Sequence, residues 1–177
     1  GVSAIILEDK IGLKKNSLFK KQEGVKQDTI KNFCNKIKAA KKAIISDDFM
    51  VIARVESFIL GKDLKDAINR AVSYSKAGAD AIMIHSKENN PKEIFAFAKK
   101  FKLSKFFKPL ISVPSTYSST YEKELIDNGF KIVIYANHLL RASHPAMTDV
   151  ASNILKNERA FESEKKLSSI KNIIKLI

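Results

Sequence analysis

The sequence predicts an α/β protein built on a parallel sheet. Short runs rich in Ile and Val alternate with longer amphipathic stretches over residues 1–136. The runs are apolar at consecutive positions, as in strands that are buried on both faces of a parallel sheet. Polar and ionisable residues follow each run, and the carboxyl ends of parallel strands carry the chemistry of α/β folds. Both a doubly wound sheet and an incomplete (β/α)8 barrel fit this pattern.

Five segments have the length and composition expected of the strands. They are Val2–Leu7, Met50–Val55, Ala81–His85, Leu110–Val113 and Lys131–Tyr135. Helical stretches with recognisable ends separate them. Asp63 can cap a helix that stops at Gly78. Asn90-Pro91 can begin the next helix, with proline in its first turn.

The chain is predicted to be one domain with two portions. Residues 1–136 hold the βα units, including a long loop at about residues 10–28, and residues 137–177 are predicted to be helical. A complete barrel takes about 250 residues, so this length accommodates about five of its eight units. Because Gly1 leads directly into an apolar strand, we expect the chain to be an N-terminally truncated part of a longer protein.

The composition excludes several classes of protein. A hydrophobic fraction of 45% is too high for a disordered chain, and no apolar run reaches the roughly 18 residues of a membrane span. The single cysteine, Cys34, excludes a disulfide framework and a cysteine zinc site, and it indicates a cytoplasmic protein. Glycine-rich phosphate-binding motifs and the common hydrolase and metalloprotease motifs do not occur.

The net charge of +13 does not by itself predict nucleic-acid binding. The 32 basic residues comprise 28 Lys and four Arg, which are spread along the chain without a like-charged block. Proteins that read nucleic acids rely on Arg for bidentate contacts. We therefore attribute the charge to a Lys-, Ile- and Asn-rich composition, and we expect neither a nucleic-acid nor a membrane partner.

The residues at the strand ends predict a polar site. Glu8-Asp9-Lys10 follows the first strand, Arg54 and Glu56 end the second, and His85 ends the third. A carboxylate, a guanidinium and an imidazole at one edge suit a small anionic substrate with a hard metal ion. Each residue also has a structural alternative: Glu8 can pair with Lys10, Arg54 can pair with Glu56, and His85 can be a core histidine.

The connection at about residues 10–28 is long for a compact domain. It carries several lysines together with Asn16 and Ser17. Loops of this length are usually lids, binding loops or disordered segments. We interpret this one as a lid that closes cationic and amide donors over a phosphate and excludes water. The alternative is a solvated basic loop.

Together these residues resemble the phosphoenolpyruvate mutase family of the isocitrate lyase superfamily. Glu8-Asp9-Lys10, Lys14 and Asn16-Ser17 match its E-D-K-x-x-x-K-x-N-S signature. Four further blocks match in order and spacing: Ala53-Arg54-Val55-Glu56, Gly78-Ala79-Asp80-Ala81, residues 83–87 and residues 136–142. The lyases of the superfamily carry a cysteine where this chain has Asn16, so the resemblance disfavours a lyase.

The resemblance implies a (β/α)8 TIM barrel, of which this chain would hold about strands 4–8 and the C-terminal helices. It implies the Mg²⁺-assisted interconversion of phosphoenolpyruvate and phosphonopyruvate, a step of phosphonate biosynthesis. Phosphonopyruvate hydrolase is the near alternative, since it differs mainly in a lid that admits water. A non-catalytic basic binding module is a further alternative.

The resemblance also implies roles for individual residues. Glu8 would contact Mg²⁺ through water, Arg54 would clamp the phosphoryl group or the carboxylate, and His85 would hold a substrate oxygen. The lid would contain Lys14, Asn16 and Ser17. The family's metal-binding aspartates lie on earlier strands, so the chain alone is expected to be inactive.

The resemblance further implies a homodimer or homotetramer in which a C-terminal helix is exchanged between subunits. The last residues have a broad apolar face that requires cover. Its members are Phe161, Leu167, Ile170, Ile173, Ile174 and Ile177. The alternative is a helix that packs on its own barrel.

Overall fold

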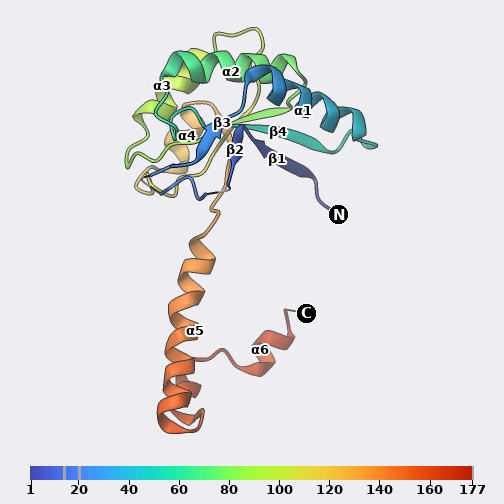
Figure 1. Cartoon of the computed structure of the whole chain (residues 1–177). Helices are drawn as coiled ribbons and strands as arrows, with labels where there is room; N and C mark the ends of the chain where they lie inside the picture. Colours follow the sequence, from blue (N-terminus) through green and yellow to red (C-terminus); the bar gives the residue numbers. More distant parts are fainter. Residues whose placement is uncertain (14, 20, 177) are drawn as a thin grey trace. The chain divides into compact units, whose positions relative to one another are not determined.

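Five parallel strands form the sheet that the sequence predicts (Figure 1). In sheet order they are β1 (Ala4–Glu8), β4 (Met50–Val55), β5 (Ala81–Ile84), β6 (Leu110–Ser112) and β7 (Phe130–Val133). Sheet order follows chain order, so each helical crossover joins neighbouring strands. This computed structural model describes residues 1–13, 15–19 and 21–176. The chain divides into two compact units, Gly1–Tyr135 and Ala136–Ile177.

Four helices of the first unit pack on one face of the sheet. They are α1 (Ile30–Ala43), α2 (Leu64–Lys76), α3 (Lys92–Phe101) and α4 (Glu122–Asp127). Side chains from all four helices share a core with alternate residues of the strands, including Val51 and Ala53 of β4. The predicted ends of α2 are confirmed: the Asp63 side chain accepts a hydrogen bond from Asp66 N at 2.8 Å, and Gly78 follows with a φ of 111°.

Strand alternation places the charged residues on the opposite face. Ile52 of β4 and Met83 of β5 belong to a second apolar cluster, apart from the core beneath the helices. Successive side chains of a strand point to opposite faces. Arg54 therefore lies on the face away from the helices, two residues beyond Ile52.

The segment at residues 10–28 is more ordered than the predicted open loop. Its ends, β2 (Lys10–Gly12) and β3 (Val25–Gln27), pair as an antiparallel hairpin, which leaves residues 13–24 as the connection. Strands of three residues are too short to show an alternating pattern in the sequence. Gly12 has a φ of 97°, and a Cβ there would lie 2.6 Å from the carbonyl oxygen of Gly24, so the hairpin requires glycine.

Several element boundaries differ from the prediction by one or two residues. β1 begins at Ala4 and includes Glu8, and β7 begins at Phe130 and ends at Val133. Pro91 caps α3 and does not lie in its first turn. Element ends fray and follow hydrogen bonding, which composition reports only loosely.

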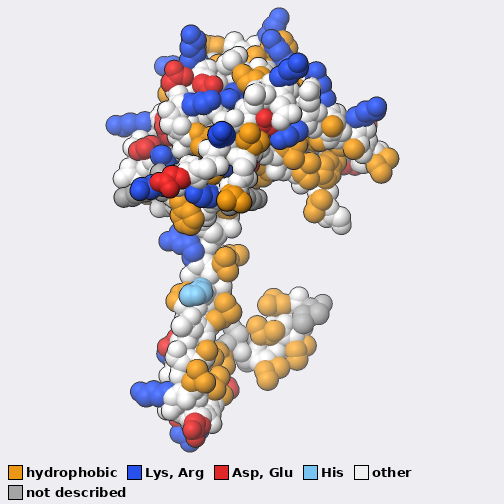
Figure 2. Space-filling model, viewed as in Figure 1, with side chains coloured by type: hydrophobic (Ala, Val, Ile, Leu, Met, Phe, Trp, Pro, Cys, Tyr) orange, Lys and Arg blue, Asp and Glu red, His pale blue; other side chains and the backbone are white. Residues whose placement is uncertain are grey.

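The second unit consists of α5 (His138–Asn157), a 3-10 helix η1 (Phe161–Lys166) and α6 (Ile170–Ile174). Lys166 Nζ lies 2.7 Å from Asp149 of α5 and ties η1 to that helix. Among the residues described in this unit, Ser163 alone is buried. Hydrophobic side chains are exposed along α5 and α6 (Figure 2). No helix in the described part of the chain is long and apolar enough to cross a membrane. The single-domain prediction stays a prediction.

Candidate active site

The carboxyl ends of β1 and β4 bring two predicted site residues together. Glu8 is paired with Arg54 in the strand register. Arg54 Nε lies 3.5 Å from Glu8 Oε2 and donates a hydrogen bond to Glu56 Oε1 at 2.6 Å. The Glu56 side chain is fully buried, whereas about a fifth of the Arg54 and Glu8 side chains is exposed. The guanidinium therefore joins a buried carboxylate to one at the surface.

Lys10 adds a second cation to the same two carboxylates. Its Nζ lies 3.1 Å from Glu56 Oε2 and 3.8 Å from Glu8 Oε1. The Lys10 side chain is only 4% exposed, although lysine is mostly a surface residue. Because two cations balance two anions, these buried charges are paired before any ligand binds.

The connection between β2 and β3 contributes Ser17 to this group. Ser17 Oγ accepts hydrogen bonds from Arg54 Nη2 at 2.8 Å and from Lys10 Nζ at 2.7 Å, and it donates to Glu56 Oε2 at 2.5 Å. Ser17 is buried. We call Glu8, Lys10, Ser17, Arg54 and Glu56 the rim cluster. A cavity of about 220 Å³ adjoins it, lined by Glu8, Lys10 and residues 11–13.

His85 follows β5 and is buried close to the cations of the rim cluster. The pKa of His85 is lowered to about 4, and burial is the largest cause. The charge of Arg54 lowers this pKa more than the charge of Glu56 raises it. The ring is therefore neutral at neutral pH. Its Nδ1 is buried and has no hydrogen-bond partner among the described residues. The predicted role of His85 at a substrate stays a prediction.

Glu56 keeps its charge in this environment. Burial alone would raise its pKa, but the charge of Arg54 and hydrogen bonds from Arg54 and Ser17 outweigh burial and lower the pKa. An ionised Glu56 can hold Arg54, Lys10 and Ser17 in one arrangement. The sequence identified Glu56 and Lys10 as strand-end residues but assigned them no role in binding.

Of the other predicted lid residues, Asn16 does not lie in the rim cluster. Asn16 is exposed, and its side-chain oxygen accepts a hydrogen bond from Leu18 N at 2.9 Å within the connection. Lys14 lies outside the described residues. The predicted roles of Asn16 and Lys14 at a substrate therefore stay predictions.

The described residues do not by themselves form a magnesium site. Among them, no group of three or more His, Cys, Asp or Glu side chains could hold a metal ion. The oxygens of Glu8 face Arg54 and Lys10. A single carboxylate in this position fits one contact through a metal-bound water at most, since Mg²⁺ keeps several of its waters.

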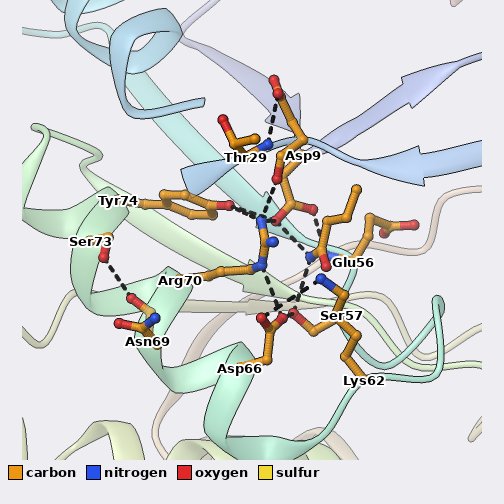
Figure 3. Close-up of polar contacts among 12 residues, drawn as sticks. Asp9, Thr29, Glu56, Ser57, Lys62, Asp66, Asn69, Arg70, Ser73 and Tyr74 are labelled. Carbon is orange, nitrogen blue, oxygen red and sulfur yellow. Dashed lines mark hydrogen bonds and ion pairs between the residues drawn. The ribbon is translucent and has the colours of Figure 1, made fainter. Parts of the chain in front are cut away.

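A buried polar network beside the rim cluster was not predicted from the sequence. Asp9 at the end of β1 is fully buried and contacts Arg70 and Tyr74 of α2 (Figure 3). A signal for Arg70 was present: Arg occurs four times in this chain against 28 Lys. Arginine is favoured where several fixed hydrogen bonds converge.

Comparison with known proteins identifies relatives over nearly the whole chain. The sequence model of the family described as phosphoenolpyruvate phosphomutase matches residues 1–155. The phosphoenolpyruvate phosphomutase of Tetrahymena pyriformis is 39% identical over 176 residues, which are 99% of this chain and 57% of that protein. The chain therefore spans a little more than half the length of this relative.

Solved structures confirm the predicted fold. The crystal structure of phosphoenolpyruvate phosphomutase from Streptomyces platensis subsp. rosaceus is 36% identical and matches with a TM-score of 0.90, over 99% of this chain and 59% of that chain. A crystal structure of phosphonopyruvate hydrolase with oxalate and Mg²⁺ is 38% identical and has a TM-score of 0.84, with the same coverage. The parallel sheet matches these TIM-barrel structures, and the similarity to the mutase and to the hydrolase is nearly equal.

Proposed function

Because the chain belongs to the phosphoenolpyruvate phosphomutase family, we propose that it carries the anion-binding side of an active site that interconverts phosphoenolpyruvate and phosphonopyruvate. The observation that carries the proposal is the convergence of Arg54 and Lys10 on one hydroxyl, Ser17, at the carboxyl edge of the sheet. Both cations donate to the same oxygen, and they could turn these donors toward an oxygen of an anionic substrate.

The rim cluster supports a role in phosphoryl transfer without a protein nucleophile. A loose, metaphosphate-like transition state needs positioning and charge stabilisation more than covalent chemistry. Arg54 provides a planar fork that suits a phosphoryl group or a carboxylate, and Lys10 provides a point charge. Neutral His85 would bind a substrate oxygen or hydroxyl through a ring nitrogen and would not add a third positive charge.

The connection at residues 13–24 supports the mutase over the hydrolase. It brings Ser17 into the rim cluster, where Ser17 is buried. Asn16 precedes Ser17, and a carboxamide can donate to a phosphoryl oxygen but cannot act as the acid or base of a lyase. In the mutase this cover must exclude water, because water would release inorganic phosphate.

We propose Mg²⁺ as the cofactor of the whole protein. The related hydrolase was crystallised with Mg²⁺ and oxalate. Glu8 is the described residue that would contact the ion, through water. The ion would neutralise substrate charge when bound, and its direct ligands would lie outside the residues described.

In the test, phosphonopyruvate and Mg²⁺ are added to the chain extended by the N-terminal strands of its family's barrel. The products are followed over time by phosphorus NMR. Phosphoenolpyruvate without inorganic phosphate is the expected product. Inorganic phosphate with pyruvate would overturn the mutase in favour of the hydrolase. A Lys123→Ala variant, altered in the exposed Lys123–Asp127 pair of α4, serves as the control and should match the unaltered enzyme.

We also propose that the second unit packs against a second copy of the chain. Its apolar side chains are exposed, and a groove of about 460 Å³ beside α5 and η1 is lined by Met147, Val150, Ile154 and Leu167, among others. A contiguous apolar surface of this kind is typical of an interface. Light scattering of the full-length protein should give a dimer or tetramer, and a monomer would contradict the proposal.

A further inference from the structure

Asp9 is the centre of a buried network beside the rim cluster. Its Oδ1 accepts a hydrogen bond from the backbone N–H of Glu56 at 2.9 Å. Its Oδ2 accepts from Tyr74 Oη at 2.7 Å, from Gln27 Nε2 at 2.9 Å and from Arg70 Nη1 at 3.3 Å. Donors from separate segments of the chain therefore meet at one carboxylate.

Arg70 extends the network to the base of the hairpin formed by β2 and β3. Its Nη1 also donates to the backbone oxygen of Asp28 at 2.8 Å, and its Nε donates to Asp66 at 2.9 Å. Ser57 closes a ring, because it accepts from Gln27 at 3.1 Å and donates to Asp66 at 2.8 Å. Figure 3 shows Arg70 and Tyr74 directed from α2 toward Asp9, with Glu56 and Ser57 beside them.

The network holds the two ends of the hairpin together. Asp28 N donates to the backbone oxygen of Asp9 at 2.8 Å, and Gln27 of β3 donates to the Asp9 side chain. Glu8 and Lys10 of the rim cluster flank Asp9 in the sequence. Displacement of Asp9 would therefore move both flanking rim residues and the base of the hairpin.

The network also holds Glu56, which contacts three other residues of the rim cluster. The backbone of Glu56 is bound by Asp9, while its side chain binds Lys10, Ser17 and Arg54. Stability alone does not require such a device, because well-packed apolar residues often replace a buried ion pair without loss. The hydrogen bonds of this network reach the backbone of Glu56 and of Asp28, and these two positions adjoin the rim cluster and the hairpin.

We propose that Arg70 and Tyr74 are positioning residues, which act through Asp9 to set the geometry of Glu56 and of the hairpin formed by β2 and β3. Neither residue belongs to the rim cluster. The part that concerns turnover rests on the proposed function. The part that concerns geometry stands on the network itself and is tested without substrate.

The first test measures hydrogen exchange of backbone amides in the chain carrying Tyr74→Phe. The ring keeps its packing against Phe33, with centroids 4.6 Å apart, and only the hydroxyl is lost. The amides of Glu56 and Asp28 should exchange about tenfold faster, as expected for one lost buried hydrogen bond. Tyr117→Phe is the matched control, since Tyr117 is equally buried and lies outside the network.

Two results would overturn the proposal. One is unchanged exchange at Glu56 and Asp28 in Tyr74→Phe. The other is faster exchange by the same factor throughout the sheet, since the network would then only stabilise the fold. Exchange that rises at these two amides and in residues 13–24, with the central strands unchanged, supports positioning.

The second test measures kcat and KM of the extended enzyme with Tyr74→Phe and Arg70→Lys. A positioning role predicts kcat about tenfold lower with KM changed much less, and a larger share of inorganic phosphate among the products. A uniform loss of active protein, with kcat per folded molecule unchanged, contradicts this role. If the unaltered enzyme shows no turnover, the proposed function fails, whereas the exchange experiment still decides the geometry.

Discussion

The rim cluster and the Asp9 network lie side by side and share Glu56, yet they use their charges differently. The five residues of the rim cluster contact one another through their side chains, and Arg54 and Lys10 both donate to the neutral Ser17. In the network, three donors saturate Asp9 Oδ2, and the bonds of Asp9 and Arg70 reach backbone atoms of Glu56 and Asp28. The first arrangement leaves the backbone out of its internal contacts, whereas the second ties its side chains to the backbone.

The pKa values of the two buried carboxylates are shifted in opposite directions. The pKa of Glu56 is lowered, because the charge of Arg54 and the hydrogen bonds from Arg54 and Ser17 outweigh burial. The pKa of Asp9 is raised, because burial outweighs its hydrogen bonds from Tyr74 and Glu56 N and the charge of Arg70. A carboxylate in the rim cluster is thus stabilised as an anion, whereas burial disfavours the anion in the network.

The largest effect on activity is expected for Arg54 of the rim cluster. Arg54→Ala in the extended enzyme should lower kcat/KM, because it removes a donor aimed at developing charge. The expected loss of transition-state stabilisation is about 2–4 kcal/mol. Arg54→Lys should recover part of this loss, since it restores the charge but not the fork. Steady-state kinetics of both variants provide the measurement. An unchanged rate in Arg54→Ala would remove this residue from the site.

A smaller effect contrasts the two carboxylates through the pH dependence of stability. The pKa of Glu56 is lower in the folded chain than in the unfolded chain, where it is about 4.3. The ionised form therefore stabilises the fold at pH values above about 4.3. This contribution is lost as the pH falls through the folded pKa. The stability lost in Glu56→Gln should therefore be greater at about pH 7 than at about pH 3.5.

Asp9 should show the opposite trend. Its folded pKa is raised, so the folded wild type takes up a proton first and gains stability relative to Asp9→Asn as pH falls toward the unfolded value of about 3.9. Urea unfolding of the wild type and both variants at the two pH values measures both trends. Parallel trends for the two variants would show that the carboxylates do not differ in this way.

The smallest expected effect concerns the connection above the rim cluster. Asn16→Ala should raise inorganic phosphate relative to phosphoenolpyruvate a few-fold, because it removes one hydrogen-bonding side chain from the cover. Asn35→Ala, at a position on α1 outside the rim cluster and the Asp9 network, is the control. The ratio of inorganic phosphate to phosphoenolpyruvate is measured by phosphorus NMR. An unchanged ratio would show that Asn16 does not contribute to the exclusion of water.

Local patterns predicted the parts of the fold that depend on nearest neighbours. β4 has its predicted bounds, and the cap at Asp63 and the stop at Gly78 are confirmed. The hairpin of β2 and β3 was not predicted, because each strand has only three residues and the pairing joins positions 17 apart, such as Lys10 and Gln27. Short strands gain their order from partners that no local window contains.

The sequence by itself determined the alternation of strands and helices, the placement of Glu8, Arg54 and His85 at strand ends, and the family. These features depend on periodicity, capping and short motifs, which are local. The tertiary structure alone decided that Ser17 meets Glu56 across 39 residues, and that Tyr74 reaches Asp9 across 65. Hydrogen bonds of this kind depend on how crossovers bring distant segments together, and the residue types give no sign of their partners.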